Sequence, residues 1–374
     1  MEYSLLNLTL NTYIQFSEFT LPHGKQYCFI VSPNNNDCYS QQLNSIEEGI
    51  EAIYKQFNLT KTNFRFSRIF LSDIYNQKDL LLSSNIFKTY LYKESTSIIE
   101  QLPCNGSKIQ ILLICNTNNN CKTIITDNSL ECSENNVSYI WSCNLGSNNS
   151  KSIYDETKSI LNDYDNFLIL KNMNIANNCI RTWFYIRDID NSYEEMVNAR
   201  KHYFENIGLT KETHFITSTG IEGNSEKSNS YISFDSLAIK NFDSIQYLYA
   251  QDYLNPTHEY GVTFERGIAL NFNIYKHILI SGTASINNKG EILYLGSIEN
   301  QIIRTFENIK ALLNEANADL SNIFYLIIYI RDVNDSIFIY NFMQKNYSNL
   351  PFVLVKGAVC RPGWLIEIEC EAYL

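Results

Sequence analysis

The order of apolar and polar positions near the C-terminus predicts a helix followed by a buried strand. Apolar residues at 303, 306, 309, 312 and 313 recur at helical spacing, and the helix is expected to end near Asn317. The uninterrupted apolar run at 324–330 is typical of a strand buried on both faces. Asp332 then follows in "YIRD" and predicts a turn.

The same order of elements occurs at two earlier places. The segment "IRTWFYIRDID" at 180–190 repeats the YIRD string and places Asp188 at the turn. Further upstream, a helical stripe at 46–57 precedes an apolar strand at 66–71 and Asp73. The three turn aspartates are 115 and 144 residues apart, which is the size of a domain and not of a solenoid repeat.

These repeats predict an α+β protein of three related units, 1–121, 122–241 and 242–374. Each unit is expected to open with a hairpin and to continue in the order helix, strand, turn, second helix, loop and final strand, written β-β-(β)-α-β-α-β. Helices would cover one face of a mixed sheet in each unit.

Composition limits the kinds of partner. The chain has 374 residues, 45% of them hydrophobic, and a formal net charge of -11 without a run rich in Lys or Arg. A large core is expected, whereas nucleic acids and anionic membranes are disfavoured because both require a basic surface. An anionic small molecule would have to bind through a few local arginines.

The remaining sequence signals suggest a cytoplasmic protein without a bound metal. The N-terminal segment has no features of a signal peptide, and no apolar stretch reaches the length of a membrane span. The ten cysteines include no CxxC pair, and none of the five histidines is spaced as a zinc ligand with Cys. Most cysteines are therefore expected to be reduced.

Comparison of the three units points to the last one as the location of the chemistry. The alternation of a strand places Glu367, Glu369 and Glu371 on one face, just after "CRPGW", which contains Arg361. The other two units lack a glutamate at the position of Glu367 and an arginine at that of Arg361. The first unit has Gln110 or Ile111 and Asn105 at these places, and the second has only Ser233 and Asp235 near the position of Glu367.

Four segments carry a family resemblance: "FERGIAL…ILISGTASI" within 264–286, "STGIEG" at 218–223, "IRTWFYIRD" and "VCRPGWLIEIE". Together they resemble the chorismatases, which have a RidA/YjgF-like (chorismate-mutase-like) fold and remove pyruvate from chorismate. The resemblance covers about 180–374, and the N-terminal half matches only in the order of its elements. It implies that the three units form a pseudo-trimer within one monomeric chain that needs no cofactor.

The chemistry of this reaction suits the residues of the third unit. Cleavage of the enolpyruvyl ether requires a proton on the methylene carbon, and a carboxylic acid whose pKa is raised by burial and neighbouring carboxylates can supply it. We assign this role to Glu367, and we assign the substrate carboxylates to Arg266 and Arg361 because a guanidinium binds a carboxylate bidentately. Tyr260, Gly267, Ser281, Gly282 and Thr283 are further candidate substrate contacts.

The resemblance also bears on the product. In chorismatases that form 3-hydroxybenzoate without hydrolysis, it implies a Cys before the Arg-Pro loop and a Gly beside the substrate arginine. Cys360 and Gly267 occupy these positions. The Cys360 thiol could trap or redirect an arene-oxide-like intermediate, so we expect 3-hydroxybenzoate.

Several alternatives stay open on the sequence. The enzyme could be a hydrolytic chorismatase that forms a dihydroxycyclohexadiene carboxylate, or a RidA-like imine or enamine deaminase. The chain could also be a non-catalytic protein that binds an aromatic acid. Glu367 alone would be read as a solvent-facing strand residue, Cys360 as a buried apolar residue, Gly267 as part of a bulge and Tyr260 as a packing residue. Ser281 to Ser285 could bond the backbone at a strand end, although "SGTAS" also suits amides that contact an anion.

Overall fold

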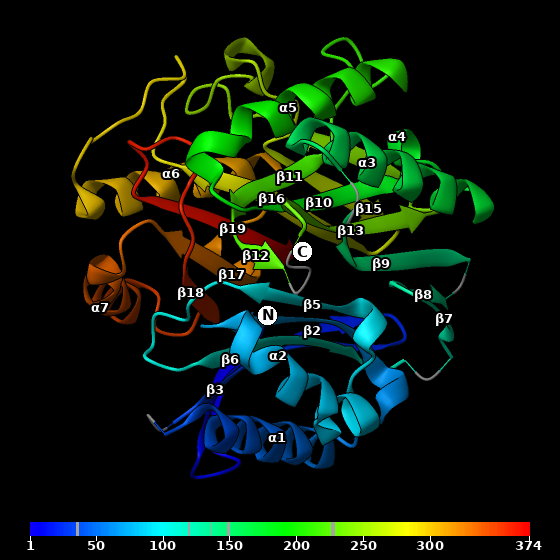
Figure 1. The fold of residues 1–374 in the computed structure, drawn as a ribbon, viewed down its shortest axis with the longest axis vertical. Helices are drawn as coiled ribbons and strands as arrows, with labels where there is room; N and C mark the ends of the chain where they lie inside the picture. The colour runs from blue at the N-terminus through cyan, green and yellow to red at the C-terminus, as the bar shows by residue number, and fades with distance from the viewer. Residues whose placement is uncertain (35–36, 119, 135, 148–149, 226–228) are drawn as a thin grey trace.

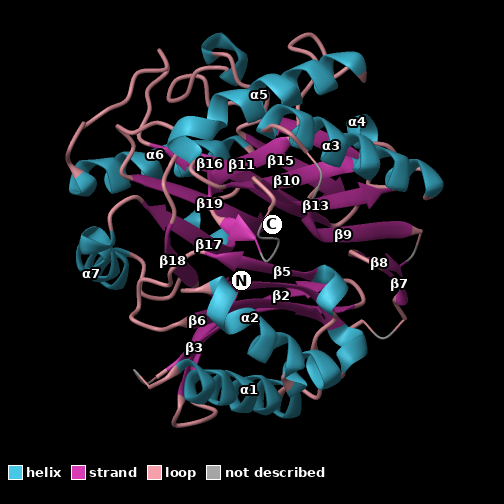
Figure 2. Ribbon diagram, in the orientation of Figure 1, coloured by secondary structure: helices cyan, strands magenta, loops and turns pink. Residues whose placement is uncertain are grey.

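Three mixed sheets with helices on their outer sides make up the computed structural model (Figures 1 and 2). It describes residues 1–374 except 35–36, 119, 135, 148–149 and 226–228, and the side chain of Tyr260 is also outside the described part. In Figure 1, α1 and α2 lie below the strands, α3 and α5 above them, and α7 to the left. The prediction of an α+β protein made of three related units is confirmed.

The first sheet has the strand order β1-β2-β3-β6-β4-β5-β12. The helix α1 carries the expected apolar stripe, with Ile46, Ile50 and Ile53 fully buried. The turn residue Asp73 caps α2 by accepting a hydrogen bond from the Asn76 backbone NH. The elements are β1 (Glu2–Leu6), β2 (Thr12–Leu21), β3 (Gly24–Pro33), α1 (Tyr39–Gln56), β4 (Phe64–Leu71), α2 (Ile74–Ser83), β5 (Thr96–Glu100), β6 (Ile109–Asn116) and β12 (Asn224–Ser225).

The second sheet has the order β11-β10-β13-β9-β8-β7. The β12 strand belongs to the second unit by sequence but pairs with β5 at the edge of the first sheet, so the two units share a strand edge. Asp188 stands at the start of α5 in the left-handed backbone region, with φ 51°, and accepts hydrogen bonds from Asn191. The elements are β7 (Lys122–Thr126), β8 (Ser129–Glu134), β9 (Val137–Leu145), α3 (Ile153–Leu170), α4 (Ile175–Asn178), β10 (Cys179–Ile186), α5 (Ile189–Asn206), β11 (Thr217–Glu222) and β13 (Ile232–Lys240).

The third sheet has the order β14-β15-β16-β19-β17-β18. Its strand β19 pairs with β16 on one side and β17 on the other, which places the glutamate-rich "IEIECEAY" in the middle of the sheet. Asp332 accepts a hydrogen bond from the Asn334 backbone NH at the expected turn. The elements are β14 (Ser244–Leu248), β15 (Gly267–Phe272), β16 (Tyr275–Ala284), α6 (Ile298–Glu315), β17 (Ile323–Ile330), α7 (Ser336–Asn346), β18 (Phe352–Lys356) and β19 (Ile366–Tyr373).

Two expectations are corrected in detail. Each unit has a short strand between its second helix and its final strand, namely β5, β11 and β18, which the predicted pattern omitted. These strands run parallel to the buried strand of their unit. In α6, Ile303 is 42% exposed and Ile302 takes its place in the core, because the buried face is turned by one residue from the predicted stripe.

The strand registers define which residues of the three units correspond. Gln110 stands opposite Phe70, Ser233 opposite Tyr185, and Glu367 opposite Tyr329. These three aromatic partners each lie three residues before the turn aspartate of their unit. The structure therefore selects Gln110 and Ser233 as the counterparts of Glu367. Only the third unit has an ionisable residue at this position.

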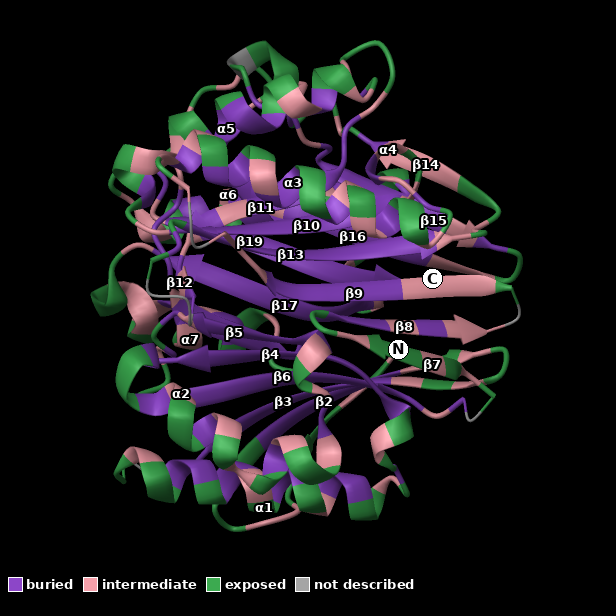
Figure 3. Ribbon diagram, turned by 45° about the vertical axis from the view of Figure 1, so that its right-hand side comes forward, coloured by how far each residue is buried: buried purple, intermediate pink, exposed green. Residues whose placement is uncertain are grey.

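The strands enclose a shared interior, in which the buried residues of all three units meet (Figure 3). Phe66 of the first unit stacks on Trp141 of the second, with 4.4 Å between ring centroids. Single backbone bridges join Pro103 to Val355 and Ile221 to Val359 across the units. The inward faces of the three sheets therefore form one core, and a polar side chain on these faces is removed from solvent.

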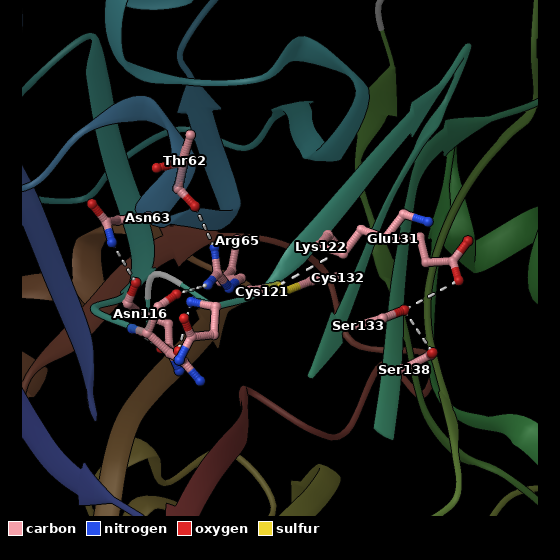
Figure 4. The surroundings of a disulfide bond; sticks show 12 residues. Thr62, Asn63, Arg65, Asn116, Cys121, Lys122, Glu131, Cys132, Ser133 and Ser138 are labelled. Atoms are coloured by element: carbon pink, nitrogen blue, oxygen red, sulfur yellow. Dashed lines mark hydrogen bonds between the residues drawn. A yellow bond between two sulfur atoms is a disulfide. The ribbon is translucent and has the colours of Figure 1, made fainter. Parts of the chain in front are cut away.

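Eight cysteines are free thiols, in line with the expectation for most of them. Cys121 and Cys132 instead form a disulfide at the β7–β8 hairpin (Figure 4), which the cysteine spacing did not indicate. Among the described residues, no helix combines the length and the apolar character that crossing a membrane requires.

Candidate active site

A small cavity between the second and third units contains Glu367, the glutamate that the other two units lack. Its free interior is about 40 Å³, enough for very few water molecules. The second unit contributes side chains from α5 and β11, and the third unit contributes β16, β19 and the loops before β15 and β19. The lining residues are Tyr193, Arg200, Ser218, Gly220, Val262, Phe264, Arg266, Gly282, Ala284, Ile286, Cys360, Arg361, Trp364 and Glu367.

Direct hydrogen bonds hold β11 of the second unit against β16 of the third. The Ser218 backbone NH donates to Ser281 Oγ over 2.9 Å, and the Gly282 NH donates to Thr219 Oγ1 over 3.0 Å. The Ser281 hydroxyl in turn donates to the Glu265 carbonyl over 2.6 Å. Because these groups are buried and paired, the wall between the two units is fixed by strand geometry and not by flexible loops.

Glu367 lies in this cavity with its carboxyl group against Gly282. The residue is 6% exposed, and the register between β16 and β19 shifts between Ile280 and Thr283. A Cβ atom built on Gly282 would lie 2.2 Å from Glu367 Oε1, so any larger residue would occupy the space of the carboxyl group. Glycine at this bulge therefore makes room for the Glu367 side chain.

Burial and a neighbouring charge keep Glu367 protonated near neutral pH. Burial is the larger cause and Glu369 adds to it, while Arg181 and Arg266 act in the opposite direction. The net effect raises the pKa of Glu367 from 4.5 to about 8. Because Glu367 is buried, the alternative that it is a solvent-facing strand residue is excluded.

Glu369 is held by groups from the first and the second unit. Its carboxylate accepts hydrogen bonds from Arg181 over 2.9 Å and from Trp183 Nε1 over 2.8 Å. Thr219 Oγ1 donates to it over 2.5 Å, and Arg68 of the first unit lies 3.4 Å away. Two buried guanidinium groups thus fix a carboxylate on the same strand face as Glu367, which explains the like-charge effect on the Glu367 pKa.

Three guanidinium groups face the cavity. Arg266 is buried and donates to the Asn255 backbone carbonyl and side-chain amide oxygen, over 3.1 and 3.2 Å. Arg361 is half-buried, lies over the Trp364 ring at 4.8 Å and donates to the Gly290 carbonyl. Arg200 is buried on α5, with its guanidinium 3.3 Å from Ser218 Oγ. With a neutral Glu367, the charged side chains that line the cavity are all cationic.

Cys360 also lines the cavity, on the loop before β19. Burial is the main cause that raises the pKa of its thiol to about 12, and Glu367 adds to it. The thiol is therefore neutral at physiological pH, which makes it a weak hydrogen-bond donor and a poor nucleophile.

Not all expected contacts reach the cavity. Gly267 lies in β15, where a Cβ atom would meet Ile280 at 2.8 Å, outside the cavity lining. Ser281 and Thr283 of β16 are fully buried, and their hydroxyls donate to the backbone carbonyls of Glu265 and Ser281 respectively. This is the backbone bonding that the sequence offered as an alternative to anion contact. Tyr260 ends the short 3-10 helix Thr257–Tyr260, and its side chain lies outside the described part of the chain.

The sequence did not identify the contribution of α5. Arg200 stands on the helix face that includes Met196 and Phe204, at four-residue spacing, and this apolar stripe is the one signal that its side chain would be buried. Tyr193 stands two turns before Arg200, and its ring would lie 3.1 Å from a Cβ atom built on Gly220. Neither residue belongs to a segment of the family resemblance, whereas Ser218 and Gly220 lie in "STGIEG".

The arrangement can bind a small anion and protonate it. Guanidinium groups suit carboxylates, and the apolar walls formed by Val262, Phe264, Ile286 and Trp364 suit a ring. The free interior is smaller than such a ligand, so entry of a ligand requires the lining to rearrange. In the described part of the chain, no group of three His, Cys, Asp or Glu side chains is arranged to hold a metal ion.

Comparison with known proteins agrees with this architecture. The sequence model of the family described as endoribonuclease L-PSP matches residues 268–374. A RutC family protein of Pyrococcus abyssi is 36% identical over 98 residues, which are 26% of this chain and 77% of that protein.

Among solved structures, a chorismatase superimposes with a TM-score of 0.66 at 15% identity, covering 94% of this chain and 100% of the other. A YjgF family member from Neisseria meningitidis has a TM-score of 0.27 at 19% identity, with 35% of this chain and 96% of that one covered. The chorismatase likeness shows a shared fold over almost the whole length, and the expected RidA/YjgF-like architecture is confirmed.

Proposed function

The chain belongs to the RutC (RidA/YjgF-like) family, and from this premise we propose that it is a chorismatase, an enzyme that removes pyruvate from chorismate. The observation that carries the proposal is a buried carboxyl group that stays protonated near neutral pH in a cavity lined by three guanidinium groups. Chorismate is a dianion with an enol ether, so it needs both cationic groups and a proton donor.

Glu367 is the proposed acid. It transfers its proton to the methylene carbon of the enolpyruvyl group, and the carbon attached to the ether oxygen gains oxocarbenium character. The carboxylate left on Glu367 is then close enough to Arg181 and Arg266 to be stabilised by their charges. Burial therefore favours the acid before the step, and the two arginines offset the cost of its charge after it.

The arginines are the proposed binding groups. Arg266 and Arg361 of the third unit line the cavity together with Arg200 of the second unit, and these guanidinium groups would hold the two carboxylates of the substrate. Arg266 is oriented by Asn255, so its guanidinium is already ordered without a ligand. Such preorganisation lowers the entropic cost of binding.

We further propose 3-hydroxybenzoate as the product. After protonation, the ring carbon–oxygen bond breaks and pyruvate leaves with the ether oxygen. The neighbouring ring hydroxyl keeps its proton and bonds to the carbon so vacated, which gives a protonated arene-oxide-like intermediate. The original carbon–oxygen bond of that hydroxyl then breaks, and loss of the ring proton from the carbon that now carries the oxygen, which returns to Glu367, gives the aromatic product; no water is gained or lost overall. The small free interior and the neutral Cys360 thiol beside Glu367 favour this route over attack by water.

The test is incubation of the purified protein with chorismate, with pyruvate measured by a coupled lactate dehydrogenase assay and the ring product by chromatography. One pyruvate and one 3-hydroxybenzoate are expected for each chorismate consumed. A dihydroxycyclohexadiene acid would refute the product assignment, and absence of pyruvate would refute the chorismatase proposal. Glu367→Gln is the inactive variant, and Glu307→Gln on the exposed side of α6 is its matched control.

A further inference from the structure

A second and larger cavity lies at the other end of β19. Its volume is about 430 Å³, within the range of small-molecule sites, whereas the cavity at Glu367 has about 40 Å³. The three hairpins β2–β3, β8–β9 and β15–β16 surround it, so all three units contribute to its walls. The lining residue Glu371 is four positions from Glu367 on the same strand face, which corresponds to about 13 Å.

The walls of this cavity are rich in aromatic rings. Phe272 and Tyr275 stack with 4.8 Å between their centroids, and Tyr139 stacks on Phe272 at 6.3 Å. Tyr373 and Trp141 add two more ring faces to the lining. Stacked and tilted rings around an open volume fit a planar ring, because aromatic groups gain by offset or edge contacts.

A buried polar cluster stands at one wall of the cavity. Glu371 accepts hydrogen bonds from the hydroxyls of Tyr373 and Tyr325 over 2.8 and 2.9 Å, and its other close neighbour is His277 Nε2 at 2.7 Å. Burial opposes the charge of Glu371, but His277 and the hydroxyls outweigh burial and lower its pKa. The Glu371 carboxylate is therefore ionised among donors, and its Oε2, which accepts one of these three bonds, can accept a further donor.

This cluster occurs only in the third unit, as Glu367 does. The strand registers place Ile114 and Leu237 at the positions of Glu371, opposite Phe66 and Arg181 respectively. The other two units thus carry an aliphatic residue where the third buries a charge. A buried charge is costly and apolar residues serve the fold equally well there, so the third unit holds this group for another reason.

A cation stands on another wall. Arg65 is 6% exposed and donates to the backbone carbonyls of Thr62, Phe64 and Asn118, over 2.8, 3.0 and 3.4 Å. Figure 4 shows it beside Cys121 at the β7–β8 hairpin. In the described part of the chain its bonds go to carbonyl oxygens and not to a carboxylate, so its charge is not neutralised by an ion pair.

We propose that this cavity is a second ligand site, for a small planar aromatic compound that carries one carboxylate and one hydroxyl group. Arg65 binds the carboxylate, the ring lies among Tyr139, Phe272 and Tyr275, and the hydroxyl donates to the cluster around Glu371. Asp243 at the exposed rim and Glu134 in the wall disfavour a dianion. The site is independent of the reaction proposed at Glu367.

Titration with 4-hydroxybenzoate, monitored by calorimetry and by tryptophan fluorescence, tests the proposal. The Trp364→Phe background removes the tryptophan of the first cavity. The signal then comes from Trp141, which lines the second cavity, and from Trp183, which stacks on it. We expect saturable 1:1 binding, and at least tenfold weaker binding of phenol and of benzoate, which each lack one of the two groups.

Two matched arginine variants locate the site. Arg65→Gln should weaken 4-hydroxybenzoate binding at least tenfold, and Arg361→Gln, in the first cavity, should leave it unchanged. His23→Trp, at an exposed turn on the rim, should block entry without disturbing the core, and so keeps the test decisive if Arg65→Gln does not fold. Absence of saturable binding, or its loss in Arg361→Gln but not in His23→Trp, would overturn the proposal.

Discussion

The raised pKa of Glu367 makes a prediction about stability that does not depend on substrate. Replacement of Glu367 by Gln keeps the size and the neutral polar character of the protonated side chain but removes its titration. In the wild-type chain, the folded state retains this proton up to a pH of about 8, whereas the unfolded state loses it near 4.5. The two proteins should therefore differ in how stability depends on pH.

The sign and size follow from proton linkage. Between these two pKa values the folded state binds one proton more than the unfolded state, so the free energy of unfolding of the wild type falls as pH rises. The loss is about 1.4 kcal/mol per pH unit and is limited to about 5 kcal/mol over the whole interval. Relative to the wild type, Glu367→Gln should gain about 4 kcal/mol of stability between pH 5 and pH 8, and little more above pH 9.

Urea denaturation of both proteins at pH 5, 6.5, 8 and 9.5 measures this difference, with tryptophan fluorescence and circular dichroism as two probes of one transition. All other titrating groups are common to both chains and cancel in the comparison. Glu307→Gln is the control, since its exposed carboxyl group should give curves parallel to the wild type. A constant difference between Glu367→Gln and the wild type across pH would refute the argument that burial holds the proton.

Three further changes test neighbouring groups. Gly282→Ala places a methyl group on the Glu367 carboxyl and should lower stability by about 1–3 kcal/mol and abolish activity, with a smaller stability loss in the Glu367→Ala background. Glu369→Gln should cost about 3–5 kcal/mol because it leaves the buried Arg181 guanidinium without its anion and Arg68 with Asp235 alone, and should move the alkaline fall of activity to lower pH. Iodoacetamide at pH 8 should label Cys38 long before Cys360, as measured by peptide mass spectrometry. Cys38 is exposed and its pKa is lowered mainly by a hydrogen bond from Ser40, whereas the pKa of Cys360 is raised. Faster labelling of Cys360 would contradict this difference.

The sequence was sufficient for features that depend on local order. The continuous apolar run of β17 is typical of a buried strand, and β4 and β10 were found because they stand at the same place between a helix and a turn aspartate. Strand alternation placed Glu367, Glu369 and Glu371 on one face, and their burial follows from the position of β19 in the middle of its sheet.

Features that depend on the arrangement of the units could not be predicted in this way. Arg200 and Ser218 reach the cavity only because β11 of one unit lies against β16 of the next. Gly282 lines the cavity and stays a candidate substrate contact, but no local pattern indicates that it also leaves space for the Glu367 carboxyl group. The short strands β5, β11 and β18 were missed because apolar runs of this length do not separate strands from loops.

Whether neutral Glu367 donates the proton to chorismate is measured by the dependence of kcat/KM for pyruvate release on pH. We expect a plateau below pH 8 and a tenfold fall per pH unit above it, with activity lowered by at least about 100-fold in Glu367→Gln. A rate that rises through pH 8, or activity retained by Glu367→Gln, would contradict it.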